Sequence, residues 1–136
     1  MPEEMIEVKI ENLIGPSLDW AVAEAEGIPN RTFSEKRFAL FGSLAIPIGN
    51  AENGYAPSAC WHCGGPLIKK HHVNLHSPQH SDDVWVAWVN IRGNDFAQGA
   101  DQPLVAVCRA IVSAKLGDVV SVPAELIQTA PGTCAA

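Results

Sequence analysis

The chain is short of basic residues and has no long hydrophobic run. Lysine and arginine number 9 against 15 acidic residues, so the 136-residue chain carries a formal net charge of −6. Binding to nucleic acid without sequence preference relies on basic side chains that neutralise phosphates, and we therefore expect no nucleic-acid partner. The most apolar stretch, residues 38–49, is too short to cross a bilayer and contains Gly42 and Pro47. We expect no membrane association.

Targeting and catalytic signatures are missing as well. The first residues, MPEEMIEV, lack the basic and apolar segments of a secretory signal peptide, which predicts a cytoplasmic protein whose four cysteines are free thiols. No segment has the Gly-x-Ser-x-Gly elbow of hydrolases or the Lys-Ser/Thr ending of a phosphate-binding Walker loop. The sequence predicts no catalytic residue and no cofactor.

The strongest apparent metal motif is Cys60-Trp61-His62-Cys63. It precedes further histidines at positions 71, 72, 76 and 80, and such a set could supply zinc ligands. The spacing matches no standard zinc finger. The pair also falls in a segment rich in proline and glycine, without the strand–helix–strand setting of redox cysteines. We predict no metal site and keep a small metal- or thiol-dependent enzyme as the least favoured alternative.

The length predicts one globular domain over residues 1–128, with a flexible tail over 129–136. The fold class is α+β, with two helices packed on a small, mainly antiparallel sheet. Alternation or apolar runs predict strands at Met5 to Ile10 and Val84 to Ile91. Proline and glycine bracket two apolar helices, one from Pro16 to Gly27 and one from Pro103 to Gly117.

The remaining segments are predicted as loops and short strands. Residues 29–53 are interpreted as a long irregular connection with one short strand around 38–46. A loop at 55–66 would lead into short strands at 67–68 and 73–75, and residues 93–99 form a turn region. The segment at 119–122 and the following PAEL would close the domain.

Two helical residues do not fit their apolar surroundings. Trp20 points away from the buried stripe of its helix, so either the chain itself covers it or it contacts a ligand or a second subunit. Arg109 lies on a helix that is apolar around most of its circumference, and it needs a carboxylate, a set of carbonyls or an anionic ligand. The structural interpretation of Arg109 is an ion pair with Asp19, Glu24 or Glu26 of the first helix.

The segment from Tyr55 to Gly65 combines aromatic faces with accessible backbone. Tyr55, Ser58, Trp61, Gly64 and Gly65 together suit a planar ligand such as a nucleobase, held by stacking and a few hydrogen bonds. The same residues equally suit a hydrophobic core beside a tight turn. We take these five residues, with Trp20 and Arg109, as the candidate ligand-binding set.

Three ordered blocks resemble the NinX-like proteins of tailed phages. They are the Leu-Asp-Trp-Ala-Val-Ala segment from Leu18 to Gly27, the segment from Tyr55 to Pro66 with the nearby Trp85 to Ala87, and the helix from Pro103 that leads to Leu126. Cys60, His62 and Cys63 depart from the family pattern, which has non-ligand residues there. The resemblance implies a phage or prophage accessory protein of the bacterial host cytoplasm and brings no activity with it.

The sequence therefore predicts a small, non-enzymatic binding protein, with oligomerisation as a further expectation. The favoured ligand is a small nucleotide-like molecule. The alternative is an inhibitor that binds a host protein through its acidic surface and the 29–53 segment.

Overall fold

The computed structural model describes residues 4–33, 36–49 and 54–127, so the predicted tail over 129–136 lies outside the described residues. The described part holds three helices and eight strands. The strands form three small sheets in which every pairing is antiparallel. The predicted α+β class is confirmed, whereas the predicted count of two helices on one sheet is wrong.

The helices are α1 (Pro16–Ala25), α2 (Trp61–His71) and α3 (Pro103–Leu116). Both α1 and α3 begin with proline, whose missing N–H costs nothing in the first helical turn. Gly117 ends α3 with a φ of 100°, a backbone conformation that favours glycine. Across the described ranges, no helix combines the length and the apolar character needed to cross a membrane.

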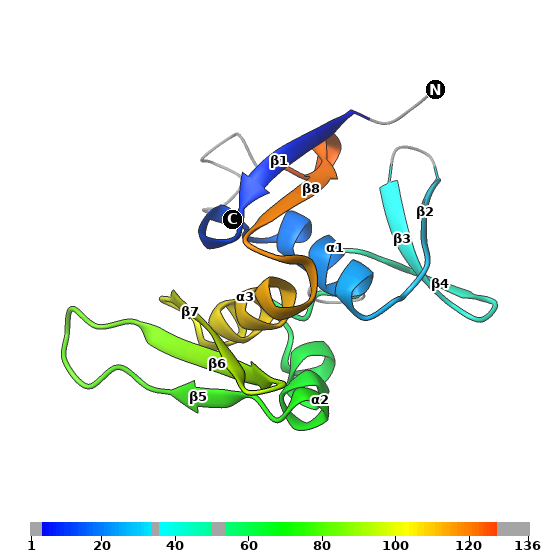
Figure 1. Ribbon diagram of the computed structural model, residues 1–136. Helices are drawn as coiled ribbons and strands as arrows, with labels where there is room; N and C mark the ends of the chain where they lie inside the picture. Colours follow the sequence, from blue (N-terminus) through cyan, green and yellow to red (C-terminus); the bar gives the residue numbers. More distant parts are fainter. Residues whose placement is uncertain (1–3, 34–35, 50–53, 128–136) are drawn as a thin grey trace.

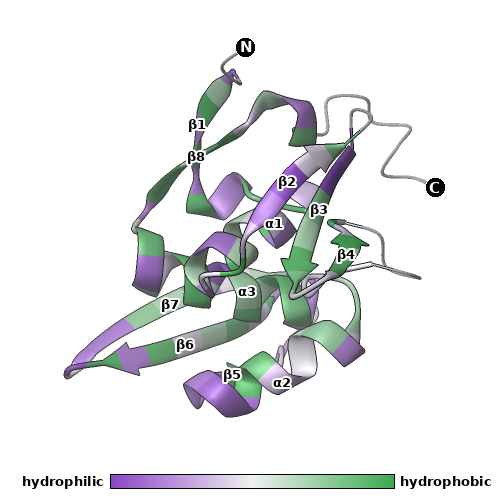
Figure 2. Ribbon diagram, turned by 90° about the vertical axis from the view of Figure 1, so that its right-hand side faces the viewer, coloured by the Kyte–Doolittle hydropathy of each residue, from purple (hydrophilic) through white to green (hydrophobic). Residues whose placement is uncertain are grey.

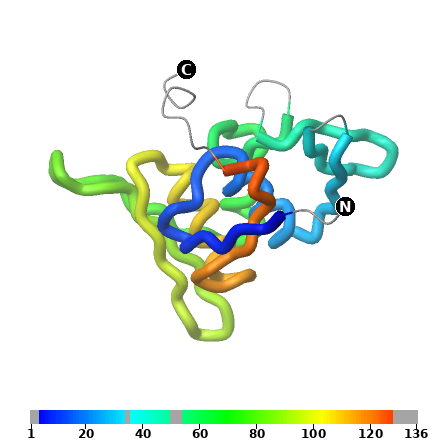
Figure 3. Tube along the Cα trace, turned by 90° about the horizontal axis from the view of Figure 1, so that it is seen from above, coloured from blue at the N-terminus to red at the C-terminus, as the bar shows by residue number. Residues whose placement is uncertain are grey.

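Each sheet has two or three strands. The first pairs β1 (Met5–Lys9) with β8 (Val119–Pro123); the second has the order β2 (Asn30–Phe33), β3 (Lys36–Phe41), β4 (Leu44–Pro47); the third has the order β5 (Asn74–His76), β6 (Trp85–Ile91), β7 (Asn94–Ala100). Short 3₁₀ turns, Ile10–Asn12 and Ala124–Leu126, follow β1 and β8. The sheet β2–β4 and the sheet β5–β7 lie on opposite sides of the helices (Figures 1 and 3).

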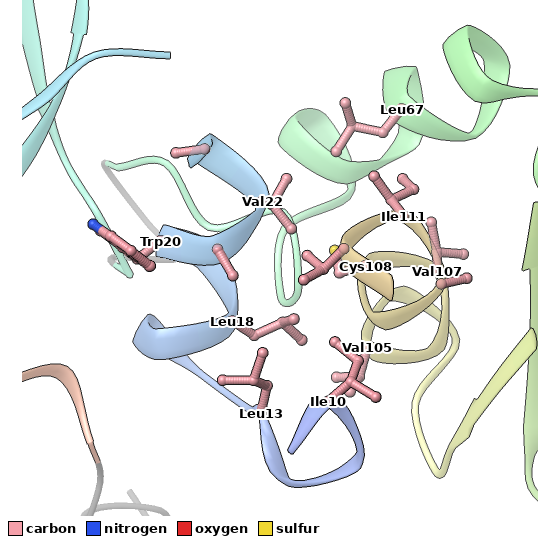
Figure 4. Packing of buried hydrophobic residues seen from close by; sticks show 14 of the residues in the cluster. Ile10, Leu13, Leu18, Trp20, Val22, Leu67, Val105, Val107, Cys108 and Ile111 are labelled. Carbon is pink, nitrogen blue, oxygen red and sulfur yellow. The ribbon is translucent and has the colours of Figure 1, made fainter. Parts of the chain in front are cut away.

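Helix α3 is the centre of the core. It packs against β6 and β7 on one side and against α1 on the other (Figure 1). Figure 4 shows Leu18 and Val22 of α1 pointing toward Cys108 of α3, and all three side chains are fully buried. Burial of an aliphatic side chain of this size contributes about 1.5–3 kcal/mol, so this helix pair holds the scaffold together. The hydrophobic colour of α3 and β6 in Figure 2 marks the same region.

Helix α2 corrects the predicted loop at 55–66 and the predicted strand at 67–68. Gly64, Gly65 and Pro66 are poor helix formers, yet all three lie inside α2. The helix forms because Leu67 is buried in the core and Gly64 packs closely against neighbouring segments. Tertiary packing therefore overrides the local preference. The segment that was predicted as a strand at 73–75 becomes β5, one residue later.

Two further predictions are wrong because they assign too few residues to strands. The segment predicted as an irregular connection with one strand holds the three strands β2, β3 and β4. The predicted turn region at 93–99 is strand β7, which pairs with β6 along its whole length. The turn is only Arg92-Gly93, and both residues have positive φ angles, 55° and 86°, as the common two-residue hairpin turn requires.

Candidate functional site

A pocket of about 340 Å³ opens where the beginnings of the three helices meet. Its walls come from Ile14 and Gly15 before α1, from Ser58, Ala59 and Trp61 around the start of α2, and from residues 102–105 at the start of α3. This size lies at the small end of the range of roughly 300–1,000 Å³ seen for small-molecule sites. It corresponds to a ligand no larger than a mononucleotide.

The electrostatics of the pocket follow from the helix ends. Gly15 and Gln102 are the N-caps of α1 and α3, and Trp61 is the first residue of α2. Each helix N-terminus carries partial positive charge from N–H groups that lack a partner within the helix. Three such ends facing one pocket favour a ligand with a negatively charged group. Gly15 has a φ of 64°, which brings the chain into α1 at an angle that other residues adopt only with strain.

Trp61 gives the pocket an exposed aromatic face. Its side chain is 56% exposed, although tryptophan usually buries most of its area. It lies at the pocket beside Ser58 and Ala59. An indole ring at the edge of a small pocket is suited to stack on a planar group.

Ser58 connects the pocket to a buried carboxyl group. The backbone N–H of Ser58 donates to Oδ1 of Asp19 at 2.9 Å. The Asp19 side chain is only 1% exposed, and this burial raises its pKa to about 7, even though hydrogen bonds from the Ser58 hydroxyl and N–H lower it. A carboxyl that titrates near neutral pH therefore lies directly behind the pocket wall.

Gly64 sets the distance between α2 and the pocket wall. A Cβ atom at this position would lie 2.4 Å from the Pro57 carbonyl oxygen and 2.9 Å from Leu104 Cδ2. Leu104 lines the pocket, so the absence of a side chain at Gly64 lets the first turn of α2 pack onto the start of α3. A Cβ atom on Gly65 would meet no atom within 4 Å other than those of its chain neighbours. Gly65 therefore faces away from this contact.

Arg109 supports the pocket from outside rather than lining it. Its Nε donates to the Leu13 carbonyl at 2.9 Å, and its Nη1 donates to the Gly99 carbonyl at 2.9 Å. Leu13 is next to the pocket residue Ile14. The guanidinium thus fixes the entry to α1 relative to the end of β7.

The predicted ion pair of Arg109 with α1 is wrong. The three α1 carboxylates considered for it have other partners: Asp19 accepts from Ser58, Glu24 accepts from Asn30, and Glu26 pairs with Lys70 and His71. Carbonyl oxygens satisfy the guanidinium instead, which is one of the alternatives that the apolar helix left open.

Trp20 and Tyr55 lie outside the pocket. Trp20 is 7% exposed and points away from α3, toward the sheet β2–β4 (Figure 4). Its indole N–H donates to Asn30 Oδ1 at 3.2 Å, and Arg37 Nη1 donates to the same oxygen at 2.6 Å. The chain itself therefore covers Trp20, which explains why this side chain can point away from the buried stripe of its helix. Tyr55 is also buried and packs against Phe41 with ring centroids 5.8 Å apart.

A second polar cluster joins the ends of α1 and α2. Glu26 accepts from Lys70 Nζ and from His71 Nε2, both at 2.6 Å. Hydrogen bonds and charge from these two residues lower the pKa of Glu26, although its burial acts in the opposite direction. The cluster places basic groups at the C-terminal end of α2, where they offset the negative end of the helix dipole. We assign it a structural role.

The histidines and cysteines do not gather into a metal centre in the described part of the chain. No three side chains from His, Cys, Asp and Glu come close enough to hold an ion among residues 4–33, 36–49 and 54–127. His71 binds Glu26 instead. Cys60 and Cys63 lie together at the start of α2, and Cys108 is buried in the core.

The chain matches a known protein family. The family described as Bacteriophage P22, NinX matches residues 9–115. The chain belongs to the NinX family. A search of curated proteins found no match. The matched NinX region contains α1, α2, all but the last residue of α3 and every residue that lines the pocket, so the pocket is part of the family domain.

Of the seven candidate residues in this NinX-family chain, the structure brings Ser58 and Trp61 to the pocket, and Gly64 and Arg109 support its walls. Sequence reasoning missed Asp19 as the partner of Ser58, 39 residues away. One signal was available: a carboxyl between Leu18 and Trp20 on an apolar helix needs a specific partner. Sequence reasoning also missed Gln102 and Gly15, which show no signal without the convergence of the helix ends.

Proposed function

We propose that this NinX-family protein is a non-enzymatic binding protein whose pocket takes a small, planar, negatively charged ligand of the nucleotide type. The observation that carries the proposal is the meeting of three helix N-termini with the exposed ring of Trp61 at one pocket. The helix ends would hold the anionic group, and Trp61 would stack on the base.

The apolar part of the pocket supports a planar ligand rather than a free inorganic anion. Ile14, Pro103, Leu104 and Val105 line it together with Trp61. Gln102 and the indole N–H of Trp61 are polar groups of the lining that could set the orientation of the ligand by hydrogen bonds, whereas the hydroxyl and N–H of Ser58 already bond to Asp19.

The test is a calorimetric titration of the protein with nucleoside monophosphates and with the corresponding nucleosides. We expect a monophosphate to bind more tightly than its nucleoside because only the former has a charged group for the helix ends. Trp61→Ala should weaken binding about tenfold, since base–aromatic stacking contributes about 1–3 kcal/mol, and Trp61→Phe should retain part of it. Phe33→Ala is the matched control, because Phe33 is a similarly exposed aromatic residue, 47% exposed, on β2. Equal affinities for the wild type and Trp61→Ala would refute the proposal.

A second candidate function, the inhibition of a host protein, rests on the sheet β2–β4. This sheet exposes three large apolar side chains: Phe33, Phe41 and Leu44, at 47%, 39% and 59%. Phe41 and Leu44 are cross-strand partners and form an exposed apolar pair, whereas Phe33 lies beside Lys36 at the other end of the sheet; the Phe41–Leu44 pair is the candidate protein-binding surface. Capture of a stoichiometric partner from bacterial lysate that is lost with Leu44→Ser but kept with Trp61→Ala would favour this function over nucleotide binding.

A further inference from the structure

Cys60 and Cys63 occupy a position that the sequence alone does not reveal. The predicted loop around them is the start of α2, where Cys60 is the N-cap and Cys63 closes the first turn. The N–H of Cys63 donates to the carbonyl of Cys60 at 3.1 Å, so the two residues share the first turn of the helix, and both are partly exposed. A Cys-x-x-Cys pair at a helix N-terminus is the arrangement in which a thiolate is stabilised by backbone N–H groups.

The two sulfur atoms have unequal environments. The nearby backbone N–H groups of Cys63 and His62 at the helix N-terminus lower the pKa of the Cys60 thiol. Burial raises the pKa of Cys63, whose Sγ donates to the Gly54 carbonyl at 3.5 Å. Cys60 therefore ionises more readily than Cys63.

The backbone permits a bond between them. Side chains three residues apart on a helix have Cβ atoms about 5–6 Å apart, whereas a disulfide needs about 3.8 Å. Cys60 lies outside the helix with an extended backbone, φ −119° and ψ 119°. Because Cys60 lies outside the helix, the distance between its side chain and that of Cys63 is not fixed by the helical spacing.

We propose that Cys60 and Cys63 form a redox-active dithiol that exchanges with low-molecular-weight disulfides, with Cys60 as the attacking thiol and Cys63 as the resolving thiol. This activity does not depend on nucleotide binding, although Cys60 lies between the pocket residues Ala59 and Trp61.

The exchange conserves atoms, protons and electrons. The Cys60 thiolate attacks one sulfur of an external disulfide RSSR, which forms a Cys60–SR mixed disulfide and releases RS⁻. The Cys63 thiol gives its proton to the released thiolate, and its sulfur then attacks Cys60 Sγ. The Cys60–Cys63 bond forms and the second RS⁻ leaves, taking a proton from solvent that replaces the one lost when Cys60 ionised. The protein loses two electrons and two protons, and RSSR becomes two RSH.

The test uses the full chain with Cys134→Ser, which removes the thiol outside the described residues and leaves buried Cys108 as an internal control. The reduced protein is incubated with oxidised glutathione, quenched with acid and analysed by intact mass. We expect the pair to close into an internal disulfide without a retained glutathione. Cys63→Ser should accumulate one glutathione on Cys60, and Cys60→Ser should react at least about tenfold more slowly.

A second measurement uses the unmutated cysteine pair, so its result does not depend on whether the variants fold. Brief treatment of the reduced protein with iodoacetamide at neutral pH, followed by peptide mapping, should label Cys60 well before Cys63 and leave Cys108 unlabelled. Equal labelling of Cys60 and Cys63, or a wild-type protein that keeps glutathione on Cys60 without closing the internal bond, would overturn the proposal.

Discussion

Oδ1 of Asp19 accepts a hydrogen bond from the backbone N–H of Ser58 at 2.9 Å, which ties the first turns of α1 to the pocket wall before α2. The carboxyl group is almost completely enclosed, and its environment favours the protonated form. The contact thus has a structural role, and the burial of the carboxyl group makes the region sensitive to pH.

The first prediction concerns the pH dependence of stability. The pKa of Asp19 is about 7 in the folded protein, against an ordinary value of 3.8. Between these values the native state binds more protons than the unfolded state, so this group makes the free energy of unfolding fall as pH rises from about 4 to about 7. Asp19→Asn cannot titrate, and its amide oxygen can still accept from Ser58. We expect this variant to lose that part of the slope and to exceed the wild type by roughly 1 kcal/mol or more at pH 8.

Urea denaturation at several pH values between 4 and 8 measures this effect. The variant Asp82→Asn is the control, because Asp82 is exposed and its replacement should leave the wild-type profile unchanged. A profile of Asp19→Asn parallel to that of the wild type would show that Asp19 is ionised throughout the range.

The second prediction separates two neighbouring glycines. A Cβ on Gly64 would lie 2.4 Å from the Pro57 carbonyl oxygen, which is backbone and cannot rotate away, whereas Gly65 has open space. Gly64→Ala should therefore lower the free energy of unfolding by about 2–3 kcal/mol. Gly65→Ala should change it by less than about 1 kcal/mol, because the gain in helix propensity is opposed by the contact of an added Cβ with the ring of Pro66. Chemical denaturation of both variants checks the contrast, and a similar loss in both would show that α2 does not approach Pro57 this closely.

The sequence predicted the elements that have a proline at their first residue or a continuous run of apolar residues. Helix α1 and helix α3 have proline at their first residue and an apolar circumference, and β6 is a continuous apolar run. Helix α2 and strand β7 lack such signals. Gly64 and Pro66 oppose a helix, and β7 is a polar segment, NDFAQGA, that becomes a strand because β6 supplies its partner. These two elements depend on contacts that a local pattern does not contain.

The candidate site, like the fold, was predicted only in part from the sequence. Trp61 was a candidate because its segment combines aromatic faces with accessible backbone, a pattern that equally suited a hydrophobic core; its exposure of 56% shows that it does not lie in the core. The pocket could not be identified, since it depends on three helix ends that are far apart in the chain. The loop predicted around the cysteine pair was wrong for the same reason as α2, and the role that we propose for the pair rests on the helix that begins at Trp61.

The third prediction concerns Arg109, whose guanidinium joins two carbonyl groups from different parts of the chain. Arg109→Ala leaves both carbonyls without this donor and should lower the free energy of unfolding by about 2–3 kcal/mol, as expected for hydrogen bonds to a charged group. Arg109→Lys keeps the charge but lacks the planar fork that reaches both oxygens, so it should recover less than half of the loss. Lys115→Ala, at an exposed position of the same helix, should change stability by less than about 1 kcal/mol. Denaturation in urea, together with the nucleotide titration, distinguishes the two roles of Arg109. A stable Arg109→Ala protein that no longer binds nucleotide would place Arg109 at the ligand, whereas a destabilised protein that still binds under native conditions agrees with its contacts to Leu13 and Gly99.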